Sequence, residues 1–321
     1  MTRLYVIVLL AMTALITPAW AQSRKENWKH CRDTNPEIQV VGCTAVIQSG
    51  NDKPRNLATA YDNRGNAHFA KGEYDAAIAD YNQAIRLAPV FARSLIFLSH
   101  RGIAYVNNGE YDNAIEDYNA AIRLRPYTAE AFSDRGIAYG AKGENDAAIA
   151  DYNQAIRLRP DFAYAFGNRG VAYVNKGEYE RGIEDYNWAI HLKPDYYAFF
   201  QARCIARAII GQFDQALSDC NHALSMSPND TGALGARGFT YLKMGKYDVA
   251  IADYDAALGN WNKLNPIKMW PATWLYGRSL AKEKVGDSAG ATADIAAAKE
   301  MEPKVVTWPG WSGGAGSPQT Q

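Results

Sequence analysis

The chain has 321 residues, of which 34 are basic and 34 acidic, so its formal net charge at pH 7 is zero. This balance argues against a protein that follows the phosphates of a nucleic acid, because such proteins normally carry a basic patch or a high pI. We therefore expect no nucleic-acid partner.

The first 21 residues have the composition of a secretory signal peptide. Arg3 supplies a positive charge, residues 4–16 are largely apolar, and Ala19-Trp20-Ala21 is a small-x-small cleavage site. A membrane anchor is the alternative, but the apolar run is short for a bilayer span. We expect a signal peptide over 1–21, no membrane span after its cleavage, and a periplasmic or secreted protein.

If the protein is exported, its four cysteines lie in an oxidising compartment. They are Cys31, Cys43, Cys204 and Cys220. An even number of cysteines in an oxidising compartment favours disulfides. The local pairing, Cys31–Cys43 with Cys204–Cys220, would place each bond inside one helical hairpin. The alternatives are small buried hydrophobes or, less favoured because no Cys-x-x-Cys spacing occurs, a zinc site. We expect no metal.

After this leader, a repeat organises most of the chain. Arg-Gly-Ile-Ala-Tyr at 101–105 returns 34 residues later at 135–139, and again as Arg-Gly-Val-Ala-Tyr at 169–173. Within one unit, Phe132, Gly136 and Tyr139 share a helical face, and Gly143 supplies a turn between two helices. Residues 22–57 predict an atypical hairpin that caps the repeats, and the Gly-, Ser- and Pro-rich tail 306–321 is expected to be disordered. The expected units are 58–91, 95–128, 129–162, 163–196, 197–230, 231–264 and 272–305.

This pattern resembles the tetratricopeptide repeat (TPR) family, here of an exported bacterial type. The family's aromatic and glycine positions are matched by Phe166, Gly170, Tyr173 and Tyr186, and its proline by Pro194. An arginine stands where the family has a leucine before the glycine. The resemblance implies an all-α fold, a right-handed α-solenoid of about seven hairpins over 58–305, whose first helices line a concave groove that binds a protein or an extended peptide.

A stripe of apolar and amide side chains on the first helices is the candidate groove. Apolar residues at one helical phase share a face, but burial between adjacent helices is an equal alternative for them. TPR domains that bind the carboxylate end of a peptide carry Lys and Arg on the inner face of their first helices. At the matching positions this chain has other residues, among them Asp134 and Ala202. We therefore expect no carboxylate clamp. The candidate groove residues are Asn63, Asn66, Ile103, Ile137, Asn168, Val171, Val174, Ile205, Phe239 and Leu242.

Arginine and aspartate recur at fixed phases, 16 residues apart, as in Arg135 and Asp151. They predict either a charged binding ladder or, as we favour, a clamp inside each hairpin. Tryptophans 261, 270 and 274 suggest either sugar stacking or, more simply, packing. No Gly-x-Ser-x-Gly elbow occurs and the histidines are scattered, so we expect neither enzyme nor cofactor. The sequence favours a protein-binding scaffold, with a carbohydrate-associated protein as the alternative.

Overall fold

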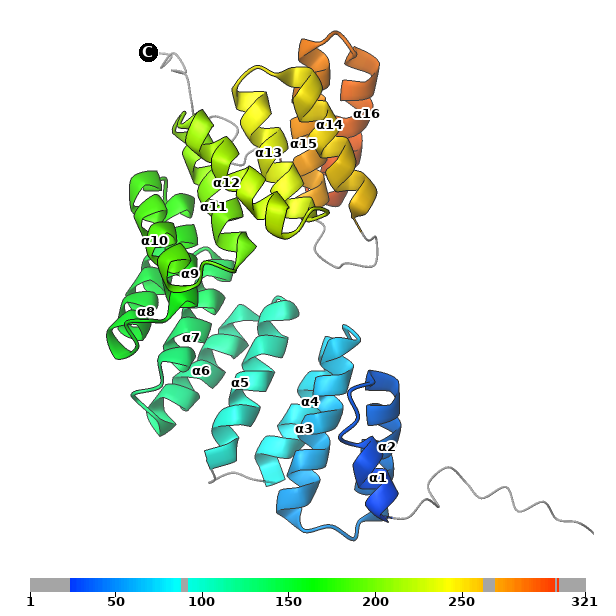
Figure 1. The fold of residues 1–321 in the computed structure, drawn as a ribbon. Helices are drawn as coiled ribbons and strands as arrows, with labels where there is room; N and C mark the ends of the chain where they lie inside the picture. Colours follow the sequence, from blue (N-terminus) through cyan, green and yellow to red (C-terminus); the bar gives the residue numbers. More distant parts are fainter. Residues whose placement is uncertain (1–23, 88–91, 262–268, 304, 306–321) are drawn as a thin grey trace, which may run out of the picture. The chain divides into compact units, whose positions relative to one another are not determined.

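The computed structural model describes residues 24–87, 92–261, 269–303 and 305, and in this part of the chain it holds sixteen α-helices and no strand. The expected signal peptide, the expected tail and much of the two segments that interrupt the repeat period near residues 90 and 265 lie outside the described residues. Consecutive helices pair into hairpins, which stack one after another within each of two units (Figure 1). The chain divides into two compact units, Met1–Leu124 and Arg125–Gln321.

The first unit contains the capping hairpin and two repeat hairpins. Its helices are α1 (Arg24–His30), α2 (Pro36–Ser49), α3 (Pro54–Ala70), α4 (Tyr74–Leu87), α5 (Ala92–Asn107) and α6 (Tyr111–Leu124). Helix α2 lies in the expected capping hairpin: the Asn35 side chain caps its first turn, and Gly50 ends it with a φ of 64°.

The second unit contains five repeat hairpins. Its helices are α7 (Ala129–Lys142), α8 (Asn145–Leu158), α9 (Ala163–Asn175), α10 (Tyr179–Leu192), α11 (Tyr197–Ile209), α12 (Phe213–Met226), α13 (Thr231–Lys243), α14 (Tyr247–Asn260), α15 (Met269–Lys284) and α16 (Ser288–Met301). The all-helical solenoid expected from the repeat is therefore the observed architecture.

Two glycines explain why each repeat closes into a tight hairpin. Gly143 ends α7 with a φ of 88°, a conformation that side chains disfavour, and thereby reverses the chain. Gly136 lies under the Tyr152 ring of α8, and a Cβ there would stand 2.7 Å from the ring. The tyrosine, 3% exposed, fills the space that the glycine leaves. The same glycine–tyrosine contact recurs at Gly65–Tyr81, Gly102–Tyr118, Gly170–Tyr186 and Gly238–Tyr254.

Candidate binding surface

Each repeat hairpin holds one arginine–aspartate pair, and the two side chains bind each other rather than solvent. In α9 and α10, Arg169 donates from Nε and Nη2 to the two carboxylate oxygens of Asp185, at 2.8 and 2.6 Å. The aspartate is 4% exposed. The same two-bond geometry occurs in all seven hairpins: Arg64–Asp80, Arg101–Asp117, Arg135–Asp151, Arg169–Asp185, Arg203–Asp219, Arg237–Asp253 and Arg278–Asp294. The clamp interpretation is confirmed, since a carboxylate held in this way is not free to bind a ligand.

In several of these pairs, the third nitrogen of the arginine joins two neighbouring hairpins of one unit. Arg169 Nη1 donates to Asn153 Oδ1 on α8 at 2.6 Å, and Arg203 Nη1 donates to Asn187 Oδ1 on α10 at the same distance. The asparagine lies two residues after the aspartate of the preceding hairpin. The Asp-Tyr-Asn sequences at 151–153 and 185–187 thus have three separate tasks: the aspartate clamps its own hairpin, the tyrosine packs on the glycine, and the asparagine binds the next hairpin. The recurring aspartate was evident in the sequence, whereas the role of the asparagine two residues later was not.

The seventh pair, Arg278 and Asp294, has an additional cation. Lys282 Nζ lies 3.0 Å from Asp294 Oδ2. Burial disfavours the charged form of this carboxyl, but the hydrogen bonds from Arg278 and Lys282 outweigh it and hold the pKa of Asp294 below its usual value.

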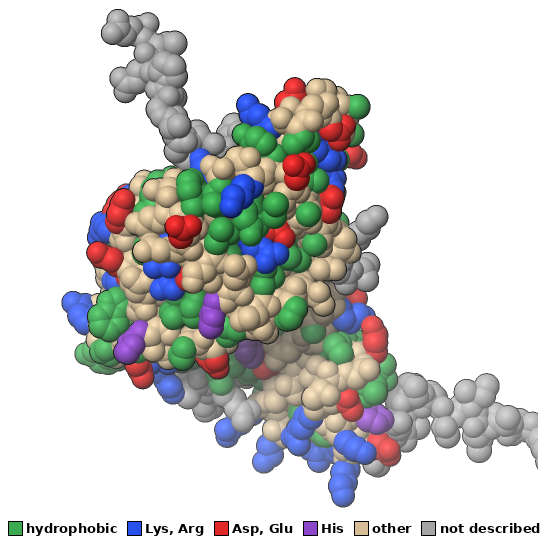
Figure 2. Space-filling model, turned by 45° about the horizontal axis from the view of Figure 1, so that its top comes forward, with side chains coloured by type: hydrophobic (Ala, Val, Ile, Leu, Met, Phe, Trp, Pro, Cys, Tyr) green, Lys and Arg blue, Asp and Glu red, His purple; other side chains and the backbone are tan. Residues whose placement is uncertain are grey.

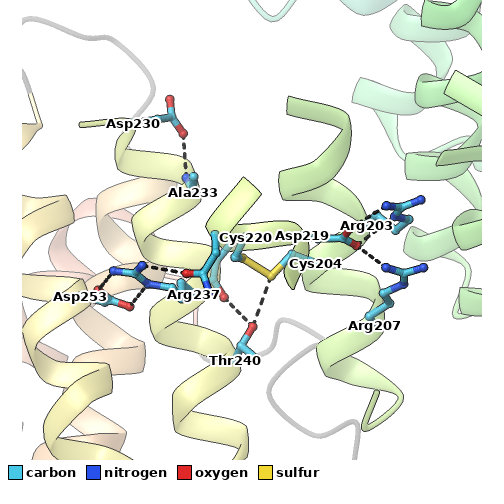
Figure 3. The surroundings of a disulfide bond; sticks show 12 residues. Arg203, Cys204, Arg207, Asp219, Cys220, Asp230, Ala233, Arg237, Thr240 and Asp253 are labelled. Atoms are coloured by element: carbon cyan, nitrogen blue, oxygen red, sulfur yellow. Dashed lines mark hydrogen bonds and ion pairs between the residues drawn. A yellow bond between two sulfur atoms is a disulfide. The ribbon is translucent and has the colours of Figure 1, made fainter. Parts of the chain in front are cut away.

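The four cysteines form two disulfides: Cys31, directly after α1, is bonded to Cys43 of α2, and Cys204 of α11 is bonded to Cys220 of α12. Each bond lies within one hairpin, and all four residues are fully buried. Figure 3 shows the second disulfide beside Thr240 of α13, whose Oγ1 lies 3.4 Å from Cys204 Sγ. Among the described residues, no group of three or more His, Cys, Asp or Glu side chains is arranged to hold a metal ion.

In the second unit, the candidate groove stripe separates into an exposed part and a buried part. Ile137 on α7 and Val171 on α9 are 40% and 44% exposed. They stand at the same phase of two first helices that lie next to each other in the stack. Asn168, one turn before Val171, is half-buried on the same face, whereas Val174 is half-buried and lies close to Gly182 of α10.

The expectation of an open stripe is wrong at Phe239, which is 4% exposed and belongs to the largest hydrophobic core cluster. Ile205 and Leu242 are half-buried and pack against the same cluster. The cause lies in small residues that let first helices approach each other. A Cβ on Gly232 of α13 would stand 2.4 Å from the Gln201 side chain of α11, and one on Gly235 would stand 2.0 Å from Trp274 of α15.

In the first unit, Ile103 on α5 is 38% exposed, but the two asparagines are committed to internal hydrogen bonds. Asn63 Nδ2 donates to the Cys31 carbonyl oxygen at 3.0 Å, which ties α3 to the capping hairpin. Asn66 Oδ1 accepts a 2.7 Å bond from the Tyr81 hydroxyl. Their expected role as free contacts for a peptide backbone is therefore replaced by a structural one.

Trp261 and Trp274, near the sixth and seventh hairpins, contribute to packing, and the side chain of Trp270 lies outside the described residues. Trp274 is 4% exposed in the core, and Trp261 packs against the same cluster. Trp274 therefore presents no open indole face for a sugar ring. The described residues include no helix of sufficient length and apolarity to span a bilayer. On the face in Figure 2, charged side chains of both signs are interspersed with hydrophobic ones, in agreement with the balanced composition.

Comparison with known proteins supports the repeat assignment. Models described as tetratricopeptide repeat or TPR repeat match residues 58–91, 102–143, 139–177, 163–196 and 236–303. A search of curated proteins found no match.

Solved structures of similar fold cover most of the chain. A tetratricopeptide repeat protein from Parabacteroides merdae is 20% identical, with a TM-score of 0.63, over 78% of this chain and 96% of that one. PilW, described as a type IV pilus biogenesis factor, is 20% identical with a TM-score of 0.56, over 67% of this chain and 96% of its own. PilF of Pseudomonas aeruginosa is 17% identical with a TM-score of 0.53, over 68% of this chain and 97% of its own.

Proposed function

The chain belongs to the tetratricopeptide repeat family, whose domains typically bind proteins or peptides, and from this we propose that it is a non-catalytic scaffold that binds an extended segment of a partner protein. The binding surface is the face formed by Ile137 on α7 and by Asn168 and Val171 on α9, which we call the α7/α9 face.

The observation that carries this proposal is that Ile137 and Val171 are both exposed at the same phase of the neighbouring first helices α7 and α9. Contiguous exposed apolar side chains commonly mark an interaction surface. The clamp arginines, aspartates and asparagines form hydrogen bonds within the protein. The side chains that can contact a partner are therefore those exposed on the first helices. Asn168 adds an amide, which both donates and accepts hydrogen bonds and so suits a peptide backbone.

We place this scaffold in the periplasm or outside the cell. The composition of residues 1–21 supports export, and the two hairpin disulfides suit an oxidising compartment. Expression of the full chain in a bacterial host, followed by N-terminal sequencing of the periplasmic product, should identify Gln22 as the first residue. Full-length protein retained in the cytoplasm would contradict the location.

A selection of 12-residue peptides from a random display library on the immobilised protein tests the binding surface. The structure begins at Arg24, so protein from Gln22 onwards contains all described helices. Selected peptides should be rich in apolar residues and should bind at least ten times more weakly to the variant Ile137→Ser/Val171→Ser. Its melting temperature should stay within a few degrees of the parent's, because both side chains are already partly in water.

Val249→Ser supplies the matched control, since Val249 is 46% exposed on the second helix α14. It should leave peptide binding unchanged. Failure to enrich any peptide, or equal binding to the double-serine variant, would overturn the proposed surface.

A further inference from the structure

An acidic side chain that has no partner among the described residues, Asp134, lies on the α7/α9 face. Asp134 precedes Ile137 by three residues on α7, so the two side chains share one face of the helix. Asn168 occupies the matching position on α9. Asp134 is half-buried, and within the described part of the chain its carboxylate has neither a hydrogen bond nor an ion pair.

The cations near Asp134 are already bound to other carboxylates. On its own helix, Arg135 holds Asp151 of α8. On α9, Arg169 holds Asp185.

The remaining titratable neighbours of Asp134 do not supply a compensating charge either. Glu130, one turn earlier, forms an ion pair with Arg159 at 2.6 Å. On α8, Tyr152 is neutral, because burial and then the charges of Asp151 and Asp134 raise the pKa of its phenol. Burial, followed by the nearby charge of Glu130, raises the pKa of Asp134 to about 6. At neutral pH the carboxylate is thus ionised and poorly solvated, and no cation among the described residues compensates its charge.

We propose that the α7/α9 face selects a partner segment in which a lysine or arginine is flanked by apolar residues, with the cation bound to Asp134 and the apolar side chains packed on Ile137 and Val171. This inference rests on the proposed function and names the partner's chemistry. A half-buried unpaired charge is unfavourable, and an opposite charge within about 4–6 Å stabilises its ionised form. The long stem of lysine or arginine can meanwhile cover apolar surface.

The same random-peptide selection distinguishes this inference from the proposed function. Selection on the parent protein should enrich lysine or arginine next to apolar residues. Selection on Asp134→Asn, which keeps the size of the side chain, should retain the apolar residues and lose the basic ones. Asp161→Asn is the matched control, since it removes one carboxylate from an exposed position of the same unit and should leave the basic enrichment intact.

The pH dependence of binding provides a second measurement. For a synthetic copy of the selected basic peptide, affinity for the parent should fall about tenfold between pH 7.5 and pH 5.0, because the ionised fraction of a group with a pKa of about 6 falls by that factor. Asp134→Asn should bind with little change over this range.

Apolar peptides without basic enrichment, or equal binding of the basic peptide to Asp134→Asn and the parent at pH 7.5, would overturn the charge selection and leave the scaffold function standing. No enrichment of any peptide would overturn both.

Discussion

Cys204 and Cys220 occupy in the α11–α12 hairpin the positions that Gly170 and Tyr186 hold in the hairpin before it. Elsewhere the tyrosine ring fills the space above the glycine; here a disulfide joins the two helices at the same level (Figure 3). The bond therefore replaces a packing contact with a covalent one, in a hairpin that also has Arg207 at the position of Tyr173.

We expect loss of this disulfide to destabilise the protein. Cys204→Ser/Cys220→Ser opens a loop of sequence separation 16, for which the chain-entropy model gives a cost of about 3 kcal/mol in the free energy of unfolding. Cys204→Gly/Cys220→Tyr restores the contact of the other hairpins and should recover part of that loss. Denaturant unfolding of the three proteins measures both effects, and equal stabilities for all three would contradict the account.

The clamp between Arg169 and Asp185 should show strong coupling. Replacement of either residue alone by alanine leaves a partly buried charge without its partner and should cost a few kcal/mol. The double variant should cost much less than the sum of the single ones, a non-additivity that a double-mutant cycle measures in denaturant. Strictly additive costs would show that the pair contributes little as a unit.

Two tyrosine hydroxyls offer a paired test of hydrogen bonding. The Tyr81 hydroxyl donates to Asn66, whereas the Tyr254 hydroxyl is buried without a partner among the described residues, because the position matching Asn66 is Phe239. Tyr81→Phe should cost about 1 kcal/mol of unfolding free energy, while Tyr254→Phe should be neutral or stabilising. Thermal unfolding of both variants measures the two changes in stability. Equal losses of stability in the two variants would contradict the predicted difference between the hydroxyl groups.

Stability should depend on pH through Asp134. Its pKa rises from 3.8 to about 6 on folding, so the folded protein binds more protons than the unfolded chain between these values, and stability falls as pH rises through that window. Asp134→Asn removes this loss. At pH 7.5 the variant should exceed the parent in unfolding free energy by at most about 3 kcal/mol, and near pH 4 the two should be nearly equal, as measured by urea unfolding at both values. A variant less stable than the parent at pH 7.5 would show that the carboxylate stabilises the fold.

The 34-residue period was sufficient to predict the hairpins, because the signals that make them are local. The spacing of Gly136 and Tyr152 within one unit, the turn at Gly143 and the Arg135–Asp151 offset each recur at fixed positions. Local periodicity determines which faces two consecutive helices turn toward each other. For the same reason, the clamp and the disulfide Cys204–Cys220 could be expected from the amino-acid sequence alone.

Exposure along the stripe was decided only by the tertiary structure. Ile137 and Phe239 occupy equivalent phases of their first helices, yet one is 40% exposed and the other 4%. The difference comes from neighbouring helices: Gly232 and Gly235 allow close contacts with side chains of α11 and α15, and Phe239 is buried in the core that results. A repeat period specifies on which face of its helix each residue lies. The burial of that residue depends on how closely neighbouring helices approach, and this distance is set by the side chains at each contact between helices.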